Sequence, residues 1–230
     1  MADDFFVKAH RNLSLTGEGN IQSLFANRAG AVVQVNLIDQ LIAAGYGYHV
    51  TIGALTTPIQ GGGAGTILDT LQPEFSLAVP SGSAIYLIRG SVQAELPADQ
   101  DGDVQEILFA ADRLAASNAS SATGTVEVAF NMRTDNPRSS LCTVVSANTV
   151  NITAPTHGLE IARKQEVTNI VTSGITQGVL ELLYEPLSPL LLVGPASFYA
   201  LWGGTQAMSA FGQFQWVEMP EALNALWGGS

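Results

Sequence analysis

The residues best suited to bind a metal ion form a short acidic stretch, Asp99-Gln-Asp-Gly-Asp, which Glu106 follows closely. Alternating carboxylates supply the oxygen ligands that a hard cation such as calcium requires. An EF-hand loop, however, has glycine at its sixth position and a bidentate glutamate at its twelfth, whereas here Gly102 is fourth and Glu106 eighth. We therefore interpret Asp99, Asp101 and Asp103 as a solvated acidic hairpin, with a cation site as the weaker alternative, and expect no required metal or other cofactor.

The remaining side chains that could perform acid–base or ligand chemistry are isolated. His10, His49 and His157 are far apart, and none has a partner at metal-ligand spacing. Glu181 and Glu185 could form a carboxylate pair, but two positions on a strand need not converge. This pattern predicts a protein that is not an enzyme.

The single cysteine and the tryptophans also have structural interpretations. Cys142 lies in an apolar stretch, where we expect a buried side chain rather than a nucleophile, and one cysteine excludes an intrachain disulfide. Trp202, Trp216 and Trp227 could stack on sugar rings. Because Trp202 and Trp216 lie within apolar runs, packing in the core is the favoured interpretation.

The elements that would position these residues are short strands. Apolar runs bounded by glycine or proline follow one another in the C-terminal third, at residues 178–184, 190–193, 197–202 and 211–219. Earlier runs at residues 46–52, 86–96 and 125–132 alternate apolar and polar residues with a period of two. We therefore predict an all-β jelly-roll sandwich of about ten strands over residues 31–230, preceded by an arm or edge segment over residues 1–30.

The alternation also predicts which side chains form the core. A short helix is expected only near residues 22–27 or 107–116, and Gly90 is expected to mark a bulge or a close approach within its strand. The predicted core consists of Val33, Val35, Tyr48, Val50, Ile88, Val92, Val126, Val128, Phe130, Leu182, Phe214 and Trp216.

Composition indicates what the surface does. Only 13% of the 230 residues are charged, against about 25% in soluble domains, so large uncharged surfaces favour a permanent oligomer. The net charge of -11 repels nucleic acid phosphates, so we expect no direct genome binding. The chain shows neither a secretory signal nor a membrane span, which predicts synthesis in the cytoplasm and no membrane partner.

Three segments resemble single jelly-roll virion proteins of bacteriophages and other viruses. The segments at residues 189–203 and 211–220 are similar to the last two strands of such proteins, and residues 75–87 are similar to an earlier strand pair. The resemblance implies a structural protein located in the virion, assembled in the host cytoplasm, most often a homotrimer that binds other shell proteins. Two alternatives stay open: a trimeric receptor- or carbohydrate-binding sandwich and, less favoured, an enzyme of the cupin or glycosidase type.

The N-terminal arm bears on the choice between a genome-facing and an exterior role. Its first twenty residues carry only Lys8 and Arg11 as basic side chains, whereas a genome-facing arm is commonly basic, so we expect an exterior role such as capsid decoration or cement. Phe5, Phe6 and Val7 are apolar yet precede the first clear strand. We therefore expect these three residues to be assembly contacts that are covered by a neighbouring subunit.

Overall fold

The computed structural model describes residues 36–61, 68–95, 104–113, 123–135, 138–148, 152, 156, 158–167, 179–205 and 208–219. The chain divides into two units, Met1–Gln40 and Leu41–Ser230, and the described strands all belong to the second unit. The expected boundary between an arm and a domain near residue 30 lies outside the described residues.

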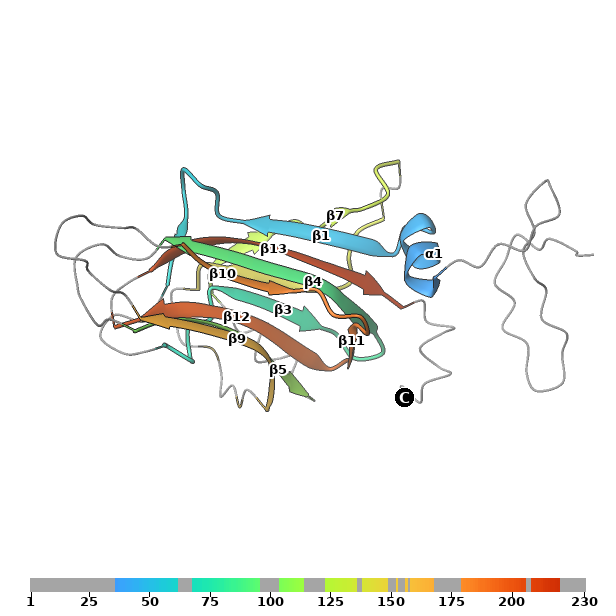
Figure 1. Ribbon diagram of the computed structural model, residues 1–230. Coiled ribbons are helices and arrows are strands. Elements are labelled where there is room, and N and C mark those ends of the chain that lie inside the picture. The colour runs from blue at the N-terminus through green and yellow to red at the C-terminus, as the bar shows by residue number, and fades with distance from the viewer. Residues whose placement is uncertain are drawn as a thin grey trace, which may run out of the picture. The chain divides into compact units, whose positions relative to one another are not determined.

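The second unit contains two antiparallel β-sheets stacked as the layers of a sandwich (Figure 1). The first sheet has the order β10 (Val179–Tyr184), β4 (Ala84–Glu95), β13 (Ser209–Glu218), β1 (Gly47–Ile52) and β7 (Phe130–Asn131); β11 (Leu190–Val193) also pairs with β4, and β2 (Ile59–Gln60) with β13. The second sheet has the order β6 (Thr125–Glu127), β8 (Thr143–Ser146), β3 (Phe75–Val79), β12 (Ala196–Gly204), β5 (Val104–Arg113) and β9 (Leu159–Val167). The predicted all-β sandwich is confirmed.

Aromatic rings from both sheets fill the space between the layers. Phe214 of the first sheet stacks on Phe75 of the second, with ring centroids 4.0 Å apart and planes inclined by 15°. Phe109 and Phe198 meet Phe214 edge to face at 5.7 and 5.8 Å. Such pairs add about 0.5–1.5 kcal/mol each beyond the burial of their area. Six members of the predicted core are buried as expected: Tyr48, Val50, Val92, Leu182, Phe214 and Trp216.

A second, smaller apolar cluster covers the outer face of the second sheet. Tyr199 and Leu201 of β12 pack there with Leu108 of β5, beneath Ile152 and Leu68 from connecting segments. The backbone N–H of Ile152 donates to the carbonyl of Leu71 at 2.8 Å. This hydrogen bond joins the connecting segment that contains Ile152 to the one that contains Leu71. Strand β12 is consequently buried on both faces, which explains its continuous apolar sequence.

The predicted core face of β4 is wrong over its first half. Ile88 is only partly buried, and Ile85 and Leu87 point inward instead. The register with β13 shifts there, because Gln215 is opposite Arg89 while Trp216 is opposite Leu87, which leaves Ile88 as an extra residue. One extra residue reverses the inward-facing set, and the bulge lies at Ile88 rather than at Gly90. At Gly90 the structure shows the alternative expectation, a close approach, because a Cβ there would lie 3.1 Å from Cε2 of Phe109.

Three further members of the predicted core, Val126, Val128 and Phe130, are wrong because they are exposed. Apolar and polar side chains alternate along residues 125–131 as predicted, but the apolar side of this segment faces solvent. Val33 and Val35 lie outside the described residues.

The helix expectations also need correction. Residues 107–113 belong to β5, and residues 22–27 lie outside the described part of the chain. A helix, α1 (Leu37–Ala43), forms where no helix was expected. Asn36 caps it, since its Oδ1 accepts from the Ile38 N–H at 3.1 Å, and Gly45 follows its end with a φ of 85°.

Candidate assembly surface

The segment Thr125–Asn131 crosses from one edge of the sandwich to the other. Its first part, β6, pairs with β8 at the edge of the second sheet, and its last part, β7, pairs with β1 at the edge of the first. Edge strands carry unpaired backbone groups, and a connection of this kind closes the open side between two edges. The segment thus covers the side of the sandwich that β1 and β8 border.

The side chains of this segment alternate, with Glu127, Ala129 and Asn131 on the inner side. Glu127 accepts a hydrogen bond from the Ser146 hydroxyl, and Ala129 packs against the main core. Val126, Val128 and Phe130 point the other way and are 71%, 68% and 61% exposed. We call these three residues the apolar row. An exposed row of large apolar side chains on a segment whose polar side chains are partly buried is typical of a surface that a partner covers.

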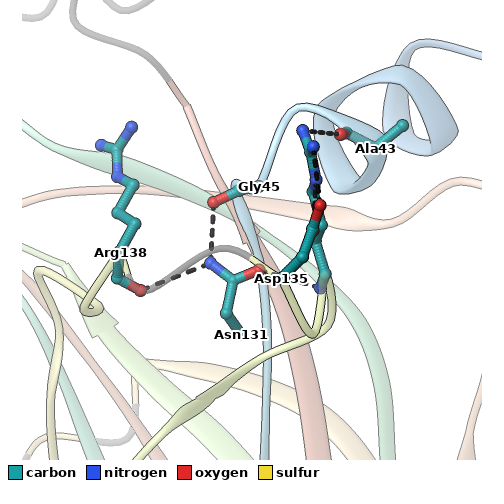
Figure 2. Close-up of polar contacts among 6 residues, drawn as sticks. Ala43, Gly45, Asn131, Asp135 and Arg138 are labelled. Atoms are coloured by element: carbon teal, nitrogen blue, oxygen red, sulfur yellow. Dashed lines mark hydrogen bonds and ion pairs between the residues drawn. The ribbon is translucent and has the colours of Figure 1, made fainter.

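Hydrogen bonds to loop carbonyls hold the end of the apolar row in place (Figure 2). The Asn131 side-chain amide donates to the carbonyls of Gly45 at 2.9 Å and Arg138 at 3.4 Å. Its Oδ1 accepts from the Arg133 N–H at 2.9 Å, and the ring of Phe130 lies 5.8 Å from that of His49. The apolar row therefore stands on a fixed backbone rather than on an unanchored loop.

An exposed ion pair continues this framework next to Asn131. Arg133 donates to both oxygens of Asp135, at 2.7 and 3.1 Å, and also to the carbonyl of Ala43 at the end of α1 at 3.0 Å (Figure 2). The hydrogen bond from Arg133 lowers the pKa of the Asp135 carboxyl, and the pair stays charged at neutral pH. Because Arg133 donates to both Asp135 and the carbonyl of Ala43, it joins this loop to the end of α1.

A buried carboxyl group anchors the loop that follows. Glu218, at the end of β13, accepts from the Ser140 hydroxyl at 2.6 Å and from the Leu141 N–H at 2.9 Å. The nearby Tyr48 hydroxyl donates to the carbonyl of Ser139 at 3.1 Å. Burial, and secondarily the charge of Glu218, raises the pKa of Tyr48.

A cavity of about 1070 Å³ opens at another part of the sandwich, where the end of β5 and the start of β9 face β11. Its lining is mainly apolar and includes Leu159, Leu190 and Leu192, with Arg113 as a charged member. The loop on its wall is fixed by buried Asp112, which accepts from the Thr156 N–H at 2.9 Å and the Gly158 N–H at 3.0 Å. No local pattern in the sequence predicts this cavity, because its lining comes from three distant stretches of the chain, near residues 113, 156–159 and 190–196.

Several side chains that could do chemistry are placed by the structure in packing or surface roles. Trp202 and Trp216 are buried, which removes both as platforms for sugar rings. Cys142 is also buried, as expected, and burial raises the pKa of its thiol well above the ordinary value. Glu181 accepts from the Gln93 amide at 3.2 Å on an exposed strand face. His49 packs on Phe130, as described above.

The other predicted sites lie outside the described residues. They are the acidic stretch with Asp99, Asp101 and Asp103, the expected assembly contacts Phe5, Phe6 and Val7, and His10, His157 and Trp227. Within the residues that the structure does describe, no three His, Cys, Asp or Glu side chains lie close enough to hold a metal ion. No helix in the same residues has the length and apolarity to cross a membrane.

Comparison with known proteins returned no match: neither a family model, nor a curated protein, nor a solved structure is similar to this chain.

Proposed function

We propose that the sandwich is a jelly roll built from eight of its strands: β1, β3, β4, β5, β9, β10, β12 and β13. Taken in chain order, the first of these pairs with the eighth, the second with the seventh, the third with the sixth and the fourth with the fifth. The first and third pairs join into one sheet and the second and fourth into the other. A long antiparallel hairpin wound around a barrel has this pairing, which supports the jelly-roll assignment.

This chain is, on that basis, a non-enzymatic structural protein of a virus particle. The nested pairing of the eight strands is the observation that carries the proposal, because it extends the resemblance to jelly-roll virion proteins from a few segments to the whole strand order. The net charge of -11 and an arm in which Lys8 and Arg11 are outnumbered by Asp3, Asp4 and Glu18 favour an exterior component, such as a capsid decoration or cement protein, over a genome-facing shell.

Self-association into a homotrimer follows as the second part of the proposal. The apolar row projects from a fixed backbone at one side of the sandwich and would lose its contact with water against a second copy. Burying a large aliphatic or aromatic side chain stabilises by roughly 1.5–3 kcal/mol. Three such residues in each copy can contribute substantially to a closed ring of subunits.

Light scattering on the purified chain tests the trimer. Three copies of the 24.1 kDa chain give a mass of about 72 kDa, and we expect this value at micromolar concentration. Val128→Asp should shift the mass toward one copy, because a carboxylate would have to be desolvated at the interface. Leu55→Asp is the matched control, since Leu55 is equally exposed but lies in the turn after β1.

A monomeric mass for the unaltered chain would overturn the trimer, and an equal effect of both substitutions would overturn the role of the apolar row.

The virion role needs a separate test. Electron microscopy of particles carrying a labelled antibody to this chain should place the label on the outer surface. Absence of the chain from purified particles, together with binding to cell-surface receptors or glycans, would favour the receptor-binding alternative instead.

A further inference from the structure

The cavity beside β11 lies where the two sheets separate at the edge of the sandwich. Strand β4 pairs with β10 over one half and with β11 over the other. Strand β10 contacts both β9 and β5 of the opposite sheet, so the layers meet on that half. Beside β11, a cavity of about 1070 Å³ lies between residues of β11 and those of β5 and β9 in the opposite sheet.

The chemistry of this cavity combines an apolar lining with one cation. Leu159, Leu190, Leu192 and Val193 supply aliphatic surface from both sheets. Arg113 is exposed at the end of β5, and in the described part of the chain its guanidinium forms no ion pair. A complementary occupant therefore has large apolar side chains with a carboxylate directly beside them.

One segment of this chain has that chemistry. Asp3 and Asp4 are followed immediately by Phe5, Phe6 and Val7. The 28 residues between Val7 and Asn36 can span up to roughly 100 Å when extended, which exceeds the radius of a domain of this size several times. The segment can thus reach a neighbouring subunit in an assembly.

We propose that this cavity receives residues 3–7 of a second copy of the chain, with the phenylalanines against the leucines and an aspartate paired to Arg113. The inference rests on the self-association proposed above and names a second contact that is separate from the apolar row. Exchange of arms links subunits without requiring a further domain, and each ordered arm adds effective affinity to the contact between the bodies.

Disulfide trapping between two differently tagged full-length chains tests the proposal. One chain carries Phe6→Cys, and the other carries Val193→Cys, at a partly exposed position of the cavity lining. Mild oxidation of the mixture should produce a covalent pair that contains both tags. Thr51→Cys is the matched control acceptor, because Thr51 is exposed on β1, well away from β11 in strand order.

Charge reversal provides a specific second readout. Adding Arg113→Glu to the acceptor chain should reduce the yield of covalent pairs several-fold, and adding Asp3→Arg with Asp4→Arg to the donor chain should restore it. A general loss of folding would not be rescued in this way. A pair yield equal to that of the Thr51→Cys control, or no response to either charge change, would overturn the proposal.

The remaining outcomes identify other occupants and also count against the proposal. A disulfide within a single chain carrying both cysteines, without pairs in the mixture, would assign the cavity to the chain's own arm. Native mass spectrometry that showed a bound fatty acid in the cavity, lost with Arg113→Glu, would assign it to a small amphiphilic carboxylate. Light scattering on the same samples distinguishes a failure of the proposed arm contact from a failure of the proposed trimer. A trimer that yields no trapped pairs would overturn the arm contact and leave the proposed function intact.

Discussion

Single polar residues in this protein fix the loops, as the carboxyl group of Glu218 shows. It is buried at the end of β13, where the Ser140 hydroxyl and the Leu141 N–H both donate to one of its oxygens. The Ser140 oxygen in turn accepts from the Cys142 N–H at 3.0 Å. One serine side chain therefore joins the loop backbone to the end of a central strand.

Replacing this serine should be costly. Ser140→Ala removes a donor from a buried carboxyl group, and a buried polar group deprived of its partner costs about 1–3 kcal/mol. We expect the free energy of unfolding in urea to fall by that amount. Ser81→Ala, in an exposed turn, is the control and should have no comparable effect. Equal effects of the two substitutions would contradict the anchoring role of Ser140.

At the level of elements, alternation in the sequence predicts strands better than it predicts their faces. The runs at residues 46–52, 178–184 and 211–219 became β1, β10 and β13 with their predicted buried residues Tyr48, Leu182 and Phe214. The alternation of apolar and polar residues shows which side chains share a face of a strand. It does not show which of the two faces packs against the other sheet. In residues 125–131 the apolar face is outside, because the polar face makes the anchoring hydrogen bonds of Glu127 and Asn131.

Bulges and caps explain the other differences. The extra residue at Ile88 inverts the first half of β4, and a glycine two positions away only indicates that some irregularity is near. The helix α1 had a recognisable signal, an asparagine cap at Asn36 and a glycine at Gly45, but its seven residues are too few to show a helical period in the sequence. The apolar row and the cavity depend on which distant segments of the chain contact one another. A local pattern of residues does not contain that information.

The packing around Gly90 of β4 leads to a testable prediction. A methyl group at Gly90 would lie 3.1 Å from Cε2 of Phe109 and 3.3 Å from Cδ1 of Phe214, within the aromatic core. Gly90→Ala should therefore lower the free energy of unfolding by about 1–3 kcal/mol, as overpacked cores do. Ser91→Ala, on the opposite face of the same strand, is the control. An unchanged midpoint in urea for Gly90→Ala would show that the rings move aside without cost.

The whole molecule has two sheets with unlike outer faces. The apolar outer face of the second sheet is covered within the chain by Leu68 and Ile152. The outer face of the first sheet carries polar side chains, among them Thr51, Gln213 and Gln215, and remains in contact with water. The exposed large apolar side chains include the apolar row and Val193 beside the cavity, and others lie on β10 and in the turn that follows it, at Val179, Leu183 and Leu187. The proposed assembly through the apolar row and the cavity would leave the polar outer face of the first sheet in contact with water.

Salt should distinguish this mode of assembly from one based on charge. Each copy carries a net charge of -11, so three copies carry -33 and repel one another at low ionic strength. Raising sodium chloride from about 0.05 to about 0.5 M shortens the Debye length and screens this repulsion, while contacts between apolar rows are not weakened. For the proposed trimer we therefore expect the concentration at which it dissociates to fall as salt rises, as measured by sedimentation velocity on a dilution series. Dissociation promoted by salt would instead indicate an interface held by ion pairs, and the apolar row would then not be the main contact.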